Sequence, residues 1–154
     1  MTTPTPVDQP PRSRAALAVL ALWVVAVVVV TVQGVVHARG NFLIFRGAFD
    51  ALVHARNIYA PAAPGLDLFK YSPSFALLFA PFAVGPVAVG WFLWTAVNAA
   101  LLYLALGRLL DGRDATFARA FVFLEMLGSL QNGQSNALVA ALVILAFTEL
   151  SRGR

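Results

Sequence analysis

The chain of 154 residues contains no cysteine and only two histidines, His37 and His54. Without cysteine there are no disulfide bonds, no thiolate metal sites and no cysteine nucleophile, and two histidines are too few for a histidine-rich metal site. Charged residues are also scarce. They make up 12% of the chain, whereas an ordinary soluble domain contains about 25%. The composition therefore argues against a soluble enzyme, a nucleic-acid-binding domain and a disordered protein.

Charged side chains are missing from three long stretches, residues 15–38, 71–107 and 126–148, and 60% of the chain is hydrophobic. Each stretch can hold a helix of the roughly 20 apolar residues that cross about 30 Å of hydrocarbon. Trp91 and Trp94, near one end of a predicted span, are typical interfacial anchors. We therefore expect an integral membrane protein of the all-α class, a polytopic transmembrane helical bundle that binds membrane lipid. Its net charge of +4 is interpreted as a topology signal rather than a nucleic-acid site.

The order of segments predicts one transmembrane domain over residues 15–150 between two tails. Residues 1–14, with four prolines, form a disordered cytoplasmic tail, and residues 151–154 form the other. The apolar segments of the domain are residues 15–36, 73–86, 87–107, 117–131 and 136–150. A cleaved signal peptide, ending near His37, is the alternative for the first segment. That segment is, however, longer than the core of about 7–15 residues typical of signal peptides.

The segment at residues 73–86 decides the topology, because it is short for a crossing and contains Pro81. It forms either a short kinked span or a re-entrant half-helix. If it does not cross, the basic residues obey the positive-inside rule, and if it crosses they do not. In the arrangement without a crossing, the cytoplasmic basic residues are Arg12, Arg14, Arg108, Arg113, Arg119, Arg152 and Arg154. Those outside are Arg39, Arg46, Arg56 and Lys70. We therefore expect a plasma-membrane protein with a cytoplasmic N-terminus and an aqueous loop at residues 109–119.

The predicted outer loop, residues 37–72, contains an amphipathic helix over residues 41–56. Apolar and polar side chains there repeat at helical spacing. Phe42, Phe45 and Phe49 fall on one face, while Arg46, Asp50 and His54 follow at i, i+4 and i+8 on another. Such a helix is suited to lie on the membrane interface.

The same loop carries the residue types that a lipid-phosphate-dependent transferase needs. A carboxylate takes the acceptor proton and cations stabilise the departing phosphate. The candidates are Asn41, Arg46, Asp50, His54, Asp67, Lys70 and Tyr71. The alternative is a solvated ion ladder on the helix, with Lys70 anchoring the headgroup region.

Two further polar features interrupt the last apolar segments. Glu125 is an ionisable residue in an apolar context, and such residues are functional candidates by default. The alternative is that it reaches the aqueous loop near Arg119. The string Gln131-Asn132-Gly133-Gln134-Ser135-Asn136 forms either the tip of a helical hairpin or a break in one span. Its amides either bind a sugar or headgroup, or satisfy backbone groups at the break.

Several motifs together resemble the N-terminal part of glycosyltransferase family 87, formerly a domain of unknown function. They are Asn41-Phe42-Leu43-Ile44-Phe45-Arg46, Ile58-Tyr59, the stretch from Asp67 to Pro81 that includes Lys70-Tyr71-Ser72-Pro73, and the string from Gln131 to Asn136. The resemblance covers about residues 15–150. Members are polytopic transferases of the GT-C type, similar to polyprenol-phosphate-mannose-dependent mannosyltransferases.

The resemblance implies a hexosyltransferase that inverts the sugar on the extracytoplasmic face, with a polyprenyl-phosphate sugar as donor and with no nucleotide sugar, cofactor or metal. Many members carry an aspartate just after the first span, where this chain has Asn41, which cannot act as a base. The resemblance therefore leaves Asp50 or Asp67 as the base and gives phosphate binding to Arg46 and Lys70. Other substrate-binding candidates are Asn41, Tyr71, Glu125, Gln131, Gln134 and Asn136.

Members of this family are usually longer than the present chain, so we expect a truncated form that needs a partner chain to complete the bundle. A rival prediction is a non-catalytic integral membrane protein that binds a partner or lipid. The third prediction is a small transporter, for which the broken helices are the sole support.

Overall fold

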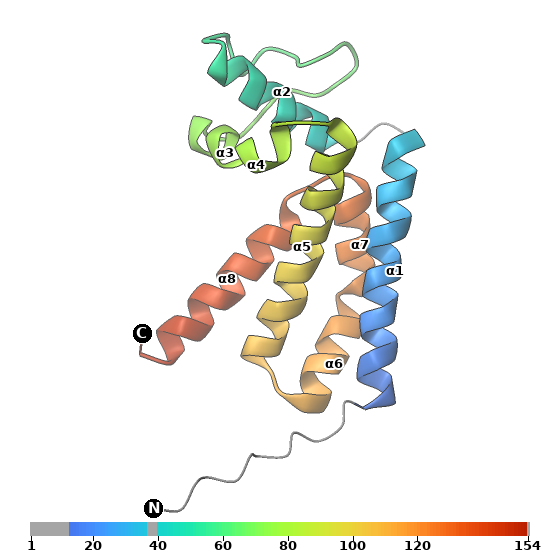
Figure 1. Ribbon diagram of the computed structural model, residues 1–154. Helices are drawn as coiled ribbons and strands as arrows, with labels where there is room; N and C mark the ends of the chain where they lie inside the picture. Colours follow the sequence, from blue (N-terminus) through green and yellow to red (C-terminus); the bar gives the residue numbers. More distant parts are fainter. Residues whose placement is uncertain (1–12, 37–39, 154) are drawn as a thin grey trace, which may run out of the picture.

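The computed structural model describes residues 13–36 and 40–153, and these described residues form helices and no strand, so the all-α prediction is confirmed (Figure 1). The proposed cleavage site at His37, most of the predicted tail at residues 1–14, and Arg154 lie outside the described residues. The helices are α1 (Arg14–Val36), α2 (Asn41–Val53), α3 (Pro73–Leu78), α4 (Ala80–Ala83), α5 (Val87–Leu109), α6 (Gly112–Phe121), α7 (Phe123–Gln131) and α8 (Asn136–Ser151).

Two helices are long and apolar enough to cross a membrane. They are the Arg14–Gly34 part of α1, with a mean hydropathy of 2.9, and α5, with a mean hydropathy of 1.7. The whole helices α1 and α5 have 23 residues each, so each helix is about 34 Å long at about 1.5 Å per residue. The apolar helix α8, Asn136–Ser151, is shorter. The described residues thus support two membrane-length helices rather than the full set of predicted spans.

The helices α1, α5 and α8 and the pair α6 and α7 run side by side, while α2, α3 and α4 lie across one end (Figure 1). We call this the α2 end. It also holds the last turn of α1, the start of α5 and the turn between α7 and α8. The opposite end, the α6 end, holds the start of α1, the connection between α5 and α6, and the last turn of α8.

The prediction of an aqueous loop at residues 109–119 is wrong, because α6 begins at Gly112. The charges that suggested a loop stabilise this helix instead. Asp114 lies in its first turn and Arg119 in its last, where each complements the helix dipole. A break at Val122 then separates α6 from α7, so the span predicted at residues 117–131 is divided.

The segment at residues 73–86 forms the short helices α3 and α4, which pack against α2 and the start of α5. Ten helical residues extend about 15 Å, half of the roughly 30 Å of hydrocarbon. Prolines begin or interrupt both helices, and Gly85 turns the chain into α5 with a φ of 95°. The segment therefore stays at the α2 end.

The expected amphipathic helix exists as α2, but it ends at Val53 because Ala55 adopts a φ of 51°. Phe42 and Phe45 on its apolar face are completely buried. They pack edge-on against Phe79, and Phe42 also packs against Trp91. Protein therefore covers the face that was predicted to lie on the membrane.

Helix α5 is the central element, and α8 packs along it. Its buried Asn98 joins the two helices. The side-chain N–H of Asn98 donates to the Trp94 carbonyl at 2.9 Å, and its side-chain oxygen accepts from the Leu138 backbone N–H at 3.1 Å. That N–H belongs to the first turn of α8, where helices lack intrahelical acceptors. Asn98 therefore fixes the start of α8 against α5.

Candidate functional site

The polar turn between α7 and α8 is held against the N-terminus of α2. The backbone N–H of Asn41 donates to the Asn132 carbonyl at 3.1 Å, and the Asn41 side chain donates to the same oxygen at 3.2 Å. The indole N–H of Trp94 donates to the neighbouring Gly133 carbonyl at 3.1 Å. Two stretches predicted as separate polar features therefore form one site at the α2 end.

Within this turn the amides bond to near neighbours. Asn136 donates to the side-chain oxygen of Gln134 at 3.0 Å, and Asn132 donates to the Gly128 carbonyl at 2.9 Å. Gln131 is exposed. The turn thus presents the polar groups of Gln131, Gln134 and Asn136 at the surface.

Arg46 points away from the predicted ion ladder and toward the turn between α4 and α5. One terminal nitrogen donates to the Gly85 carbonyl at 2.8 Å. The other, Nη1, is buried and has no hydrogen-bond partner among the described residues. Because a buried N–H of a cation is costly to leave unpaired, this guanidinium has unused capacity for an anionic oxygen.

Asp50 instead forms ion pairs near the end of α2. Its carboxylate pairs with Arg56, and His54 Nδ1 lies 3.2 Å from the other carboxylate oxygen. More than half of the Asp50 side chain is exposed. Of the predicted ladder of Arg46, Asp50 and His54, only the pair of Asp50 and His54 therefore forms.

Asp67 and Lys70 pair with each other on the connection before α3. Their charged atoms are 2.5 Å apart, and the Leu68 backbone N–H donates to Asp67 at 2.7 Å. The hydrogen bond from Lys70, with that from Leu68, lowers the pKa of Asp67 below its ordinary value. A lower pKa makes this carboxylate a weaker proton acceptor.

Tyr71 belongs to the aromatic cluster under α2. Its ring stacks on Phe75 at 4.8 Å between centroids and lies edge-on to Phe45 at 5.3 Å. The cluster continues through Phe79 to Trp94. These contacts fix the connection that carries Lys70 against α2.

Glu125 is not brought to this site. It is exposed on α7 and has no ion pair among the described residues. Arg119, its predicted aqueous neighbour, lies over the Tyr103 ring, 3.8 Å from its centroid. Ser129, one helical turn after Glu125, is buried.

Sequence reasoning missed the role of the tryptophans in the site. Trp91 and Trp94 were predicted as interfacial anchors, yet only 1% and 2% of their surface is exposed. Their indole N–H groups donate to the Val30 and Gly133 carbonyls. The signal was present, because Trp91, Trp94 and Asn98 follow at i, i+3 and i+7, the spacing of one buried helix face.

The described residues contain no group of three or more side chains suited to hold a metal ion. The α2 end thus offers an arginine with unused capacity, exposed amides and two exposed carboxylates. These are residue types that bind phosphate and hydroxyl groups in proteins.

Comparison with known proteins gives one family. The sequence model of glycosyltransferase family 87 matches residues 69–154, more than half of the chain. The matched region begins just before Lys70 and includes the string from Gln131 to Asn136, whereas Asn41 to Arg46 and Asp67 lie outside it. No curated protein and no solved structure matches the chain significantly.

Proposed function

Because this chain belongs to glycosyltransferase family 87, we propose that it takes part in transferring a mannose-type hexose from a polyprenyl-phosphate donor to an extracytoplasmic acceptor. Family membership and two apolar helices indicate a membrane protein. The observation that supports a site at the α2 end is the double hydrogen bond from Asn41 to Asn132. It brings the cation-bearing helix α2 beside the amides of the matched region.

The proposed orientation places the α2 end outside the plasma membrane and the N-terminus in the cytoplasm. Basic residues are more numerous at the α6 end, as the positive-inside rule requires of a cytoplasmic face. The described set there is Arg14, Arg108, Arg113, Arg119 and Arg152, against Arg46, Arg56 and Lys70 at the α2 end.

In the proposed reaction, Arg46 and Lys70 bind the donor phosphate. The acceptor hydroxyl attacks the anomeric carbon, the bond from that carbon to the phosphate oxygen breaks, and the polyprenyl phosphate leaves with the bond's electron pair. Cations stabilise the charge that develops on this leaving group. The unpaired Nη1 of Arg46 supports its assignment.

We assign the base that takes the acceptor proton to Asp50 rather than Asp67. Lys70 and Leu68 hold Asp67 as a stabilised carboxylate and lower its pKa. Asp50 lies on the same helix as Arg46, one turn later, so in this proposal α2 carries both the base and one of the phosphate-binding cations. Asn41, Tyr71, Gln131, Gln134 and Asn136 bind the sugar hydroxyls in this proposal, and Glu125 is left out of the proposed site.

A partner chain completes the bundle in this proposal. Apolar side chains on α1 and α8 are exposed, among them Val25 at 56%, Val32 at 60% and Phe147 at 60%. Exposed apolar surface of this extent marks contact with lipid or with another membrane helix.

Membranes that contain the chain, incubated with radiolabelled polyprenyl-phosphate mannose, test the proposal. We expect label in a lipid or protein acceptor above an empty-vector control. Asp50→Asn should abolish transfer, because an amide cannot accept the proton, while Asp114→Asn at the opposite end is the matched control. Activity retained in Asp50→Asn but lost in Asp67→Asn would transfer the role of base to Asp67.

A non-catalytic membrane protein that binds lipid is the second candidate, favoured by the ion pairs of both outer carboxylates. Binding of the labelled donor without transfer, abolished by Arg46→Gln, would select it. Absence of both binding and transfer would remove both functions.

A further inference from the structure

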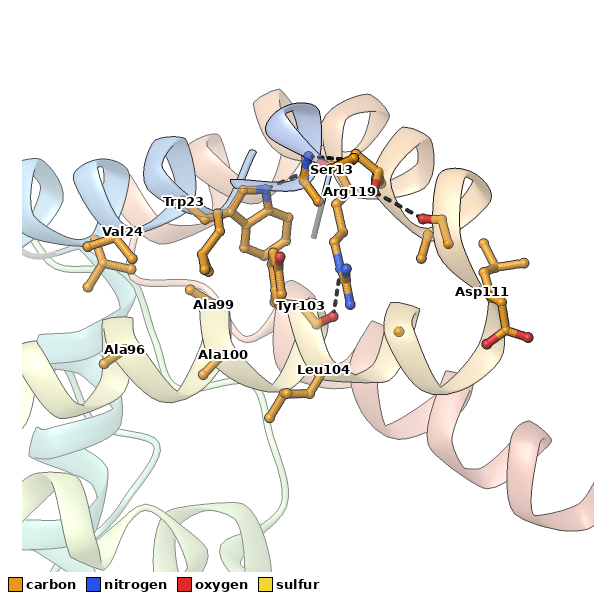
Figure 2. A pocket seen from close by; sticks show the side chains of 18 of the residues that line it. Ser13, Trp23, Val24, Ala96, Ala99, Ala100, Tyr103, Leu104, Asp111 and Arg119 are labelled. Atoms are coloured by element: carbon orange, nitrogen blue, oxygen red, sulfur yellow. Dashed lines mark hydrogen bonds between the residues drawn. The ribbon is translucent and has the colours of Figure 1, made fainter. Parts of the chain in front are cut away.

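A second candidate site runs along α1 and α5 and opens at the α6 end, on the far side of the bundle from the proposed phosphate-binding residues. Helices α1, α5 and α6 line an open cleft of about 1060 Å³ (Figure 2). Pockets for small molecules are usually about 300–1000 Å³, so this cleft is at or above the upper limit of that range.

The long wall of the cleft is apolar. Three alanines on α5, Ala96, Ala99 and Ala100, leave room opposite Val24 and Val28 of α1. From Phe92 to Gly107, both in the lining, α5 rises about 22 Å at about 1.5 Å per residue. One leaflet is about half of the roughly 30 Å hydrocarbon core. The cleft is therefore long enough for the acyl chain of a lipid.

The mouth of the cleft, between the end of α5 and α6, is polar and cationic. The Arg119 Nε donates to the Tyr103 carbonyl at 3.0 Å, and the guanidinium lies over the Tyr103 ring. Its terminal nitrogens donate to no acceptor in the described part of the chain. Arg113, also in the lining, has no ion pair there either.

One carboxylate, Asp111, also lines the mouth. It forms no ion pair with either arginine in the described part of the chain. Two cations against one anion leave a positive mouth beneath an apolar wall. This combination complements a lipid with an anionic headgroup, because a zwitterionic headgroup brings a cation of its own that the arginines repel.

We propose that this cleft binds one acidic glycerophospholipid. An acyl chain lies along α1 and α5, and the headgroup phosphate accepts hydrogen bonds from Arg119 and Arg113. Lipid binding here does not require the transfer reaction. The polyprenyl-phosphate donor of the proposed function binds at the opposite end.

Native mass spectrometry of the full chain, purified in detergent, tests this site. The probes are phosphatidylglycerol, phosphatidylcholine and polyprenyl phosphate, each added alone. We expect one retained phosphatidylglycerol per chain and little phosphatidylcholine. Ala100→Phe fills the cleft and should abolish retention without removing a charge. Arg113→Gln should weaken it about five-fold, the effect of one basic residue near an anionic surface.

Arg14→Gln is the matched control, because Arg14 lies at the same end but not in the lining. It should leave retention unchanged. Equal retention of phosphatidylcholine, or unchanged retention in both Ala100→Phe and Arg113→Gln, would overturn the proposal. Retention of polyprenyl phosphate in preference to phosphatidylglycerol, lost in Ala100→Phe, would also overturn it, because the cleft would then belong to the donor.

Discussion

The two ends of the bundle differ in how closely their phenylalanines are packed. At the α2 end the rings of Phe42, Phe45 and Phe79 are buried against one another, and Arg46 bonds to a backbone carbonyl. At the α6 end Phe117 and Phe121 are 72% and 78% exposed, and an open cleft separates α1 from α5. The first end is closed by its own packing, while the second leaves surface for another molecule.

Truncation of a phenylalanine should show the largest difference between the ends. Phe45→Ala removes a completely buried ring and should cost about 3–5 kcal/mol, since the surrounding rings cannot fill the cavity. Phe121→Ala removes an exposed ring and should change stability by less than about 0.5 kcal/mol. Unfolding of both variants in detergent measures this. Equal losses would show that the α2 end is not the better packed of the two.

Adding one methyl group to a glycine of α5 should give an intermediate effect. At Gly90 the new Cβ meets the Phe82 backbone carbonyl, whereas at Gly107 it meets only the end of the Arg119 side chain. Gly90→Ala should therefore cost about 1–3 kcal/mol through overpacking.

In Gly107→Ala the arginine moves aside, and the gain of up to about 1 kcal/mol in helix propensity offsets the contact. Thermal unfolding of the two variants tests the pair. A larger loss in Gly107→Ala would mean that Arg119 is held more firmly than its contacts indicate.

Acidification should give the smallest effect, through Asp67 at the α2 end. Folding lowers the pKa of Asp67, with Lys70 as the main cause. The contribution to stability is therefore complete above the ordinary pKa and is lost as the pH falls through the lowered one. We expect the melting temperature of Asp67→Asn to depend less on pH than that of the wild type below about pH 4, close to the ordinary pKa of aspartate. Parallel curves would show that the pair does not stabilise the fold.

Local patterns predicted the helices better than the connections. Runs of apolar residues identified α1 and α5, because helix formation in an apolar stretch depends on neighbours in sequence. The charged residues around Arg113 and Asp114 were wrongly interpreted as the sign of an aqueous loop. Charge density indicates contact with water but does not distinguish a solvated loop from a helix whose end charges complement its dipole.

For the candidate site, the sequence identified residue types but not their partners. The spacing of Arg46, Asp50 and His54 predicted a ladder, yet the turn at Gly85 gives Arg46 a backbone acceptor instead. Similarly, Trp94 looked like an interfacial anchor, since composition alone does not show that a carbonyl from the turn after α7 lies within reach of its N–H.

The sequence by itself determined that the chain is helical and apolar, where its polar interruptions lie, and which family it resembles. These properties follow from composition, periodicity and motif order along the chain. Only the tertiary structure decided that Asn41 meets Asn132, 91 residues away, and that arginines stand at the mouth of an apolar cleft. Such meetings depend on how helices pack, and packing is set by contacts between distant side chains rather than by spacing along one segment.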